Sequence, residues 1–251
     1  MTKIILCGYS GKMGHAIINC VSDRDDCKIV AGVSRTAPPH EDFPVFTCLD
    51  SCNITADVVI DFSNPSLLNS LLKFGKNSKT PIVIATTGYS DEQKQQITSA
   101  AADIPIFFTY NMSIGVNLLT VLAQKATQVL GNNFDIEIVE KHHNQKLDAP
   151  SGTALMLAES ISECCNPKPE YVYSRHDVRQ KRSKNEIGIH SVRGGTIVGE
   201  HEVIFAGMDE VITLSHTAYS KGVFAVGSIN AALFMNGKSN GLYTMKDVVG
   251  L

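Results

Sequence analysis

The segment Glu140–Ala154 carries the densest set of chemically active side chains in the sequence. It contains His142, His143 and Lys146, three groups that can each carry a positive charge. Imidazole and ammonium groups are the side chains most readily tuned to exchange protons near neutral pH. Because neighbouring residues of an extended chain project to opposite sides, we expect the two histidines to have different roles.

The same segment ends where a helix is predicted to begin. Ser151, Gly152 and Thr153 follow Pro150, and a helix N-terminus offers free backbone N–H groups and a hydroxyl that suit a carboxylate. Helix capping alone also explains this pattern, and it explains Ser151 better than a role as nucleophile does. Capping does not explain the upstream histidines and lysine. We therefore expect an anionic substrate with at least one carboxylate held beside proton donors.

Three further histidines, His190, His201 and His216, lie on or beside segments of alternating polarity. We interpret them as surface histidines or as packing histidines with satisfied hydrogen bonds. No H-E-x-x-H pattern or second ligand cluster occurs in the sequence, so no metal site is predicted. Arg193, which two glycines follow, could bind an anion or belong to a mobile loop, and the sequence leaves both interpretations open.

A second candidate site is a glycine loop near the start of the chain, Gly8-Tyr9-Ser10-Gly11-Lys12-Met13-Gly14. It follows an apolar strand and opens a helix. Glycines allow a tight turn and a close approach to a pyrophosphate, while the helix N-terminus supplies N–H donors. The spacing is one residue longer than the standard dinucleotide fingerprint, and it is not a Walker A loop. A glycine-rich turn without a ligand is the alternative.

The end of the second strand, Ser34-Arg35-Thr36, is expected to contact the adenosine ribose. A carboxylate there would favour NAD, whereas an arginine can pair with the 2′-phosphate of NADP. No acid is present, and Arg35 with Ser34 could bind that phosphate. We therefore predict NADPH as the preferred cofactor, with NADH tolerated. A merely solvated Arg35 is the alternative.

Two later loops are expected to contact the same cofactor, Ala85-Thr86-Thr87-Gly88 and Thr109-Tyr110-Asn111-Met112. Both follow buried strands, at the carboxyl edge where open α/β sheets bind ligands. Asn111 could hydrogen-bond a carboxamide. Ordinary loop capping would explain the same residues equally well.

The first half of the chain alternates apolar strands with helices. Strands are predicted at Lys3–Cys7, Lys28–Val33, Val58–Phe62, Pro81–Ala85 and Ile104–Phe108. Helices are predicted at Gly11–Val21, from Asn64-Pro65-Ser66 onward, and at Asp91–Ala102. Continuous apolar strands alternating with helices predict an α/β fold, with a doubly wound, Rossmann-type parallel sheet covered on both faces.

The pattern changes after about residue 111. A long helix at Ile114–Leu130 precedes an alternating strand at Phe134–Ile138, a helix from Ser151, and two alternating strands, His201–Ala206 and Val211–Thr217, joined as a hairpin. Gly222–Met235 reads as a helix that could return to the first domain, which the pattern alone does not decide. We predict a smaller α+β domain with an open mixed sheet after the dinucleotide-binding domain.

Composition narrows the class of protein. The 251 residues are 43% hydrophobic and 19% charged, which is globular, and the net charge of -3 offers no basic surplus for nucleic acid. No apolar run approaches the ~18 residues of a membrane helix, and no signal peptide is expected. The seven cysteines are read as reduced thiols of a cytoplasmic protein. Cys164-Cys165 could be a redox pair, although two small side chains at a helix end is the simpler interpretation.

With these segments read, the whole chain resembles the dihydrodipicolinate (4-hydroxy-tetrahydrodipicolinate) reductase family of diaminopimelate and lysine biosynthesis. The resemblance rests on the glycine loop, the Ala85–Gly88 turn, Glu140–Ala154 and Arg193–His201. The His-His-x-x-Lys-x-Asp-Ala-Pro-Ser-Gly-Thr run is specific to that family.

The resemblance implies NAD(P)H-dependent reduction of a cyclic dicarboxylate, with hydride transfer to ring C4 and protonation of the adjacent carbon. It implies that His142 and Lys146 exchange protons and that His143, Gly152 and Thr153 bind substrate carboxylate. The nucleotide is implied to contact Gly8–Met13, Ala85–Thr87 and Thr109–Met112. Homotetramers built through the sheet of the second domain, residues 112–221, are also implied. The resemblance further implies that the C-terminal helix returns to the first domain, so that 1–111 and 222–251 form the dinucleotide-binding domain.

The chain departs from the family at Ser34, where many relatives carry an acid, and this weakens the case for a strong NADH preference. A related dehydrogenase of the aspartate pathway is an alternative, but an acylating semialdehyde enzyme would need a cysteine in a suitable loop. A nucleotide-sensing regulator is another alternative. It would have no need of His142, His143 and Lys146 beside an anion-binding helix end.

Overall fold

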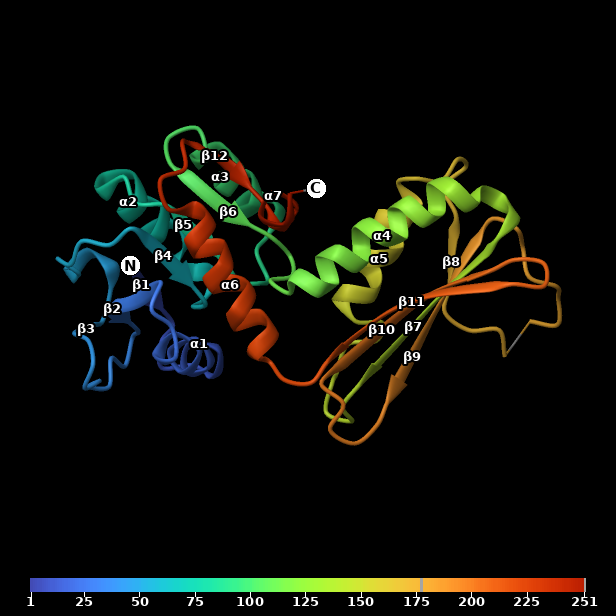
Figure 1. Cartoon of the computed structure of the whole chain (residues 1–251), viewed down its shortest axis with the longest axis horizontal. Coiled ribbons are helices and arrows are strands. Elements are labelled where there is room, and N and C mark those ends of the chain that lie inside the picture. The colour runs from blue at the N-terminus through green and yellow to red at the C-terminus, as the bar shows by residue number, and fades with distance from the viewer. Residues whose placement is uncertain (177, 251) are drawn as a thin grey trace. The chain divides into compact units, whose positions relative to one another are not determined.

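The computed structural model describes residues 1–176 and 178–250, which form two compact units (Figure 1). Unit 1 comprises residues 1–114 and 221–251, and unit 2 comprises residues 115–220. Residue 177, within the predicted segment 112–221, and residue 251, at the end of 222–251, lie outside the described residues. None of the described helices combines the length and hydropathy needed to cross a bilayer.

Unit 1 is built on a seven-stranded parallel sheet of order β12-β6-β5-β4-β1-β2-β3. Its strands are β1 (Thr2–Cys7), β2 (Cys27–Val33), β3 (Val45–Phe46), β4 (Val58–Asp61), β5 (Ile82–Ile84), β6 (Pro105–Phe108) and β12 (Gly241–Tyr243). The five predicted strands are confirmed, and the strand order reverses direction between β1 and β4. That reversal is the topological switch point at which open α/β sheets bind ligands.

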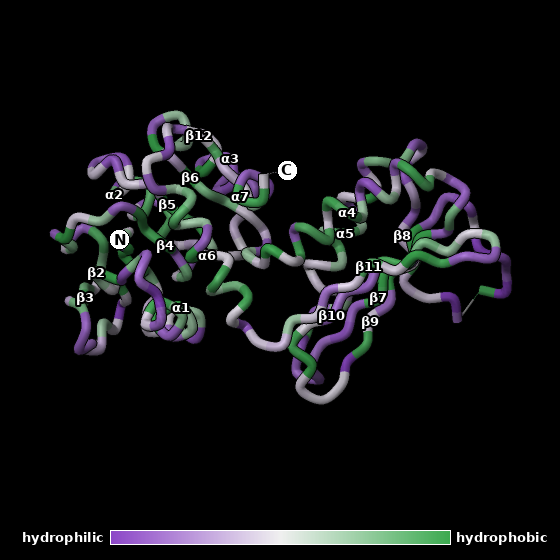
Figure 2. The backbone as a smooth tube through the Cα atoms, viewed as in Figure 1, coloured by the Kyte–Doolittle hydropathy of each residue, from purple (hydrophilic) through white to green (hydrophobic). Residues whose placement is uncertain are grey.

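Helices cover both faces of this sheet, as the doubly wound prediction required. Ile4 and Leu6 of β1 pack in one core cluster with α1 (Lys12–Ser22) and α6 (Gly222–Met235). Ile5 packs in a second cluster with α2 (Leu68–Ser78) and α3 (Asp91–Ala100). Successive residues of a strand point to opposite faces, so a continuous apolar run buries both. The helix α6 carries no charged residue, and most of its length is hydrophobic or neutral in Figure 2.

Short elements complete unit 1. The 3-10 turns η1 (Leu49–Ser51) and η2 (Pro65–Leu67) precede α2, and α7 (Met245–Val249) follows β12. At η2 the Asn64 side chain accepts a hydrogen bond from the backbone N–H of Ser66, with Pro65 in the first helical position. The predicted helix start at Asn64-Pro65-Ser66 is therefore confirmed.

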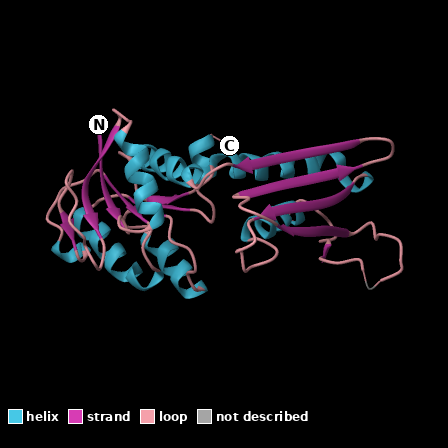
Figure 3. Cartoon of the chain, turned by 90° about the horizontal axis from the view of Figure 1, so that it is seen from below, coloured by secondary structure: helices cyan, strands magenta, loops and turns pink. Residues whose placement is uncertain are grey.

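Unit 2 contains a five-stranded mixed sheet of order β11-β10-β7-β9-β8, whose strands lie side by side in Figure 3. Its elements after α4 (Ile114–Leu130) are η3 (Gly131–Asn133), β7 (Asp135–His142), α5 (Gly152–Ser162), β8 (Glu170–Val172), β9 (Glu186–Arg193), β10 (Gly199–Ala206) and β11 (Val211–Ala218). The neighbours of β7 are antiparallel β10 and parallel β9. The predicted α+β unit with an open mixed sheet is confirmed.

Helices α4 and α5 cover only one face of this sheet. Leu119 and Ala123 of α4 pack with Leu157 of α5 against Ile136 and Ile138 of β7. The buried residues of β7 alternate strictly, and the same face continues from the two isoleucines to Glu140 and His142. A charged residue and a histidine thus extend the apolar face of the sheet at its end, which is an unusual place for polar groups unless they are paired.

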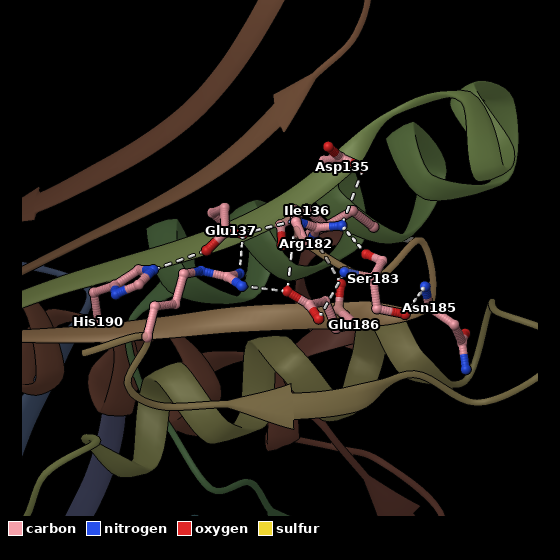
Figure 4. A network of polar contacts seen from close by, with 9 residues as sticks. Asp135, Ile136, Glu137, Arg182, Ser183, Asn185, Glu186 and His190 are labelled. Atoms are coloured by element: carbon pink, nitrogen blue, oxygen red, sulfur yellow. Dashed lines mark hydrogen bonds and ion pairs between the residues drawn. The ribbon is translucent and has the colours of Figure 1, made fainter. Parts of the chain in front are cut away.

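The opposite face of β7 carries a separate network of polar contacts (Figure 4). Glu137 accepts hydrogen bonds from the Arg182 Nε at 2.9 Å and the Arg175 Nη2 at 2.9 Å, and its other oxygen lies 2.8 Å from the His190 Nε2. Arg182 also donates to the backbone carbonyls of Ile136 and Glu186. These contacts tie the segment before β9 to the sheet.

Candidate active site

A pocket of about 320 Å³ lies in unit 1 at the switch point. Five of the predicted cofactor residues line it, namely Gly8, Ser10, Gly11, Ser34 and Arg35. Gly8 has φ of +80°, and a Cβ there would stand 2.3 Å from the carbonyl oxygen of Phe62. Only glycine fits this turn, because both the backbone angle and the space exclude a side chain.

The N-cap of α1, Gly11, lines this pocket. It offers no side-chain acceptor to the N–H groups of the first turn, and that turn contains no acidic residue. The Ser10 Oγ and Ser34 Oγ lie 2.6 Å apart, and Arg35 is exposed at the pocket wall. Free N–H groups, two hydroxyls and a guanidinium together fit a group rich in phosphate oxygens.

Asp61, at the end of β4, is a pocket residue that the sequence analysis missed. Its side chain is buried, and it accepts hydrogen bonds from the Ser63 hydroxyl and, at 2.6 Å, from the Thr86 Oγ1. Burial raises the pKa of this carboxyl, although both hydroxyls oppose the rise. The position of Asp61 could have indicated it, because the residue ends a strand that lies beside β1 at the switch point.

The remaining residues of the glycine loop do not line this pocket. The ring of Tyr9 is buried in the core, with its hydroxyl donating to the carbonyl of Pro38, and Met13 packs against the same core. Lys12 is exposed on α1. The Tyr9 ring is therefore closed off from a nucleotide by the core, whereas Met13 is only partly buried.

The two later loops also lie outside the lining of this pocket. Ala85 and Thr86 are buried, Thr87 is exposed, and Thr109 bonds to the carbonyl of Asn111 through its hydroxyl. The Asn111 Oδ1 accepts from the Ser113 N–H at 2.8 Å, which is the capping arrangement left open by the sequence. Tyr110 is exposed, and Met112 belongs to the core.

In unit 2, the end of β7 forms a compact charged cluster around Glu140. The carboxylate is fully buried and bound by both terminal nitrogens of Arg193, at 2.8 and 2.7 Å. It also lies 2.6 Å from the His142 Nδ1 and 3.1 Å from the backbone N–H of Ser151. Burial by itself would raise the pKa of Glu140, but these hydrogen bonds outweigh it and hold the pKa at about 2.

The Nδ1 of His142 is therefore occupied by its contact with Glu140. Burial lowers its pKa, against the opposing effect of Glu140 and with smaller contributions from Lys146 and Arg193. The other nitrogen, Nε2, lies near Gly199, where a Cβ would stand 3.2 Å away. A residue larger than glycine there would crowd the ring.

The prediction that His201 is a satisfied packing histidine is wrong. Its ring is buried edge-on to His142, with centroids 5.2 Å apart, and its Nε2 lies 3.0 Å from the Ser151 Oγ. Its Nδ1 has no hydrogen-bond partner among the described residues. Burial, followed by the proximity of His142, lowers the pKa of His201 to about 4. The antiparallel register of β10 with β7, which no local pattern encodes, brings the two rings together.

The loop between β7 and α5 carries the other predicted residues. The Lys146 Nζ lies 2.9 Å from the Asp148 Oδ1, and the Lys146 N–H donates to the carbonyl of His143. Ser151 caps α5 by accepting from the Ala154 N–H at 3.1 Å, so the predicted cap is confirmed. Gly152, next along the chain, is exposed at this helix start. Unit 2 thus places a helix N-terminus, an imidazole and an ammonium on one short segment.

The structure shows what Arg193 binds, whereas the sequence left open whether it binds an anion or belongs to a mobile loop. Besides binding Glu140, it donates to the carbonyl of Asp148 at 2.7 Å and so holds the loop that follows His142. The next residue pairs directly with the strand end, because the Gly194 N–H donates to the carbonyl of His142. Arg193 is therefore a bidentate partner of a buried carboxylate.

Comparison with known proteins agrees with this arrangement. Residues 2–112 match the family described as dihydrodipicolinate reductase, N-terminus, and residues 115–249 match its C-terminus. The chain is 49% identical to the 4-hydroxy-tetrahydrodipicolinate reductase of Clostridium novyi over 99% of this chain and 98% of that protein. It is 50% identical to that of Clostridium tetani over 98% and 96%.

A solved structure is similar over the same extent. It is the dipicolinate-bound dihydrodipicolinate reductase from Paenisporosarcina sp. TG-14, with a TM-score of 0.79, 29% identity, and coverage of 97% of each chain. Since both family regions match and the relatives align from end to end, this chain belongs to the dihydrodipicolinate reductase family.

Proposed function

We propose that this chain reduces 4-hydroxy-tetrahydrodipicolinate to tetrahydrodipicolinate in diaminopimelate and lysine biosynthesis, using a pyridine nucleotide with NADPH preferred. Relatives of nearly the same length carry this activity in their names. The observation that carries the proposal is the cluster at the end of β7. There, His142 is held by a buried carboxylate on the segment that also bears Lys146 and the start of α5.

The pocket of unit 1 fits the nucleotide. The N–H groups at the start of α1 would hold the pyrophosphate, and Ser34 with Arg35 would receive the ribose 2′-phosphate. We keep Ala85–Thr87 and Thr109–Met112 as proposed contacts at the carboxyl edge of β5 and β6. When bound, the nicotinamide supplies the hydride that is delivered to ring C4 of the substrate.

The segment of unit 2 fits a substrate with carboxylate groups. His143 and the backbone donors at Gly152 and Thr153 would bind one carboxylate, because a helix N-terminus favours a negative group. His142 and Lys146 would exchange the proton that reaches the carbon next to C4. Lys146 would have to leave Asp148, which it contacts at 2.9 Å, or share its charge between Asp148 and the substrate.

The direct test is turnover by His142→Ala and Lys146→Ala with the synthase product as substrate, followed spectrophotometrically through NADPH consumption. Each substitution should lower kcat by ~10²–10⁴-fold if the residue is an acid–base group. Lys141→Ala is the matched control, since this neighbouring lysine pairs with Glu200 and Glu202 on the other face of β7. Near-normal turnover by the first two variants would refute their proposed roles, and a lack of turnover by the unmodified protein would refute the activity.

We also propose a cytoplasmic homotetramer assembled through the open face of the unit 2 sheet. That face presents Val192 and Val211, both more than two fifths exposed, beside the half-buried side chains of Val139 and Ile204. Exposed apolar side chains on an uncovered sheet suit a subunit interface. Light scattering coupled to size-exclusion chromatography should give four times the chain mass, and Val211→Glu should reduce it.

A further inference from the structure

We propose that Glu140 is a positioning residue: clamped by Arg193, it holds the imidazole of His142 with the proton on Nδ1 and the lone pair on Nε2. The catalytic consequence rests on the proposed function, because it requires His142 to exchange a proton with the substrate. The positioning itself depends only on the fold of unit 2 and can be measured in the absence of turnover.

Several donors surround the Glu140 carboxylate. The Oε2 receives the Arg193 Nη1 and faces the His142 Nδ1, while the Oε1 receives the Arg193 Nη2 and the Ser151 N–H. The Ser191 hydroxyl is a further donor to this carboxylate, and a hydroxyl can adapt to either orientation of a neighbouring group. Arginine and backbone N–H groups are obligatory donors, and an ionised carboxylate can only accept. The short contact at Nδ1 is therefore satisfied only when His142 carries its proton on that nitrogen.

Ionisation of Glu140 is secured by the same contacts. A fully buried carboxylate is costly unless it is paired and hydrogen-bonded. Here the bidentate guanidinium supplies the charge, and the other groups facing the imidazole are Lys146 and His201. Neither of these offers an acceptor to Nδ1 in the described structure, so Glu140 alone determines which ring nitrogen is protonated.

A single isosteric substitution of Glu140 tests whether its carboxylate determines the tautomer of His142. In Glu140→Gln, the amide NH₂ must occupy one of the two oxygen positions. At the Oε1 position it would face two obligatory donors, Arg193 Nη2 and the Ser151 N–H. At the Oε2 position it would face Arg193 Nη1 and an imidazole nitrogen, which can become an acceptor by moving its proton to Nε2. The substitution should therefore reverse the tautomer of His142.

The same strand offers a matched control. Glu137 also contacts arginine and histidine side chains, those of Arg175, Arg182 and His190, but on the opposite face of β7 (Figure 4). Glu137→Gln makes the identical chemical change three residues away. It should leave the tautomer of His142 and kcat as they are, once chromatography has verified that the assembly of the variant is unchanged.

The experiment is ¹⁵N NMR of full-length protein labelled in histidine, followed by steady-state kinetics. We expect an Nδ1–H tautomer for His142 in the unmodified protein and an Nε2–H tautomer in Glu140→Gln. The pH midpoint of His142 should move lower, because the carboxylate that favours its charged form is gone. We expect kcat to fall ~10²–10⁴-fold, as for a lost or misdirected acid–base group, with little change in KM.

The outcomes separate the two proposals. An unchanged His142 tautomer in Glu140→Gln overturns the positioning role, whatever happens to turnover. A reversed tautomer with normal kcat supports the positioning and instead refutes His142 as the proton carrier. If Glu140→Gln does not fold, the ¹⁵N spectrum of the unmodified protein still tests the positioning. An Nδ1–H tautomer of His142 there supports it, and an Nε2–H tautomer overturns it.

Discussion

Removal of the Arg193 guanidinium should destabilise unit 2 by an amount that the structure sets. Arg193→Ala leaves the fully buried Glu140 carboxylate without its bidentate partner. The native contacts, burial included, hold its pKa at about 2, against an ordinary value of 4.5. At ~1.4 kcal/mol for each pKa unit, that difference corresponds to about 3 kcal/mol of stability at neutral pH for all the contacts of Glu140 together. Arg193 makes the largest of these contributions. Breaking a buried ion pair costs a similar ~3–5 kcal/mol.

The sign of the pH dependence follows from the lowered pKa. This stabilisation is fully present above the unfolded-state pKa of about 4.5 and is lost as the pH falls through the folded-state value of about 2. The free energy of unfolding of Arg193→Ala should therefore lie below that of the unmodified protein by the full amount at pH 7. This difference should shrink steadily as the pH falls below about 4.5.

The assay is urea unfolding followed by circular dichroism, with amide hydrogen exchange of β7 peptides to assign the transition to unit 2. For a slope of ~2 kcal/mol per molar urea, 3 kcal/mol lowers the midpoint by ~1.5 M. Lys141→Ala, which removes a half-exposed lysine from the same strand, should change the midpoint little. An unchanged midpoint for Arg193→Ala at pH 7, or a deficit that stays constant down to pH 3, would refute the reasoning.

Three further outcomes are expected. Arg35→Ala should raise the KM for NADPH and leave that for NADH unchanged; equal changes with both coenzymes in steady-state assays would exclude 2′-phosphate recognition by this exposed residue. Gly8→Ala should weaken nucleotide binding in calorimetry and cost at least ~1–2 kcal/mol of stability, since an alanine at φ of +80° is strained and its Cβ would meet the Phe62 carbonyl. Ser151→Ala should lower stability by about 1 kcal/mol through the lost cap, and unchanged protection of the first α5 turn in hydrogen exchange would count against that account.

Local patterns were sufficient for much of the fold because they reflect local physics. The apolar runs that became β1, β4 and β5 bury both faces of a parallel sheet, and their composition already required it. The cap at Ser151 was equally predictable, since a serine before a helix satisfies donors within the same turn. The strand β9 was not given bounds in advance, although His190 was placed on or beside a segment of alternating polarity, because the alternation does not extend over the whole of Glu186–Arg193.

The missed parts of the candidate site depend on register rather than on sequence proximity. Arg193 reaches Glu140 because β9 runs parallel to β7 with His142 opposite Arg193. His201 reaches His142 because β10 pairs antiparallel on the other side of β7, with His201 opposite Glu140. Strand pairing between distant segments is decided by the packing of the whole sheet. The histidine and lysine run could thus be predicted, while the groups that orient it could not.

Ser151 couples the first turn of α5 to the position of the His142 imidazole. Its N–H reaches Glu140, and its hydroxyl oxygen meets both His201 and the Ala154 N–H. The opening turn of α5 therefore cannot fray without loosening the carboxylate that steadies His142. Heating that unfolds this turn alone should abolish the activity while both sheets remain folded. The temperature of inactivation should therefore lie below the temperature of global unfolding.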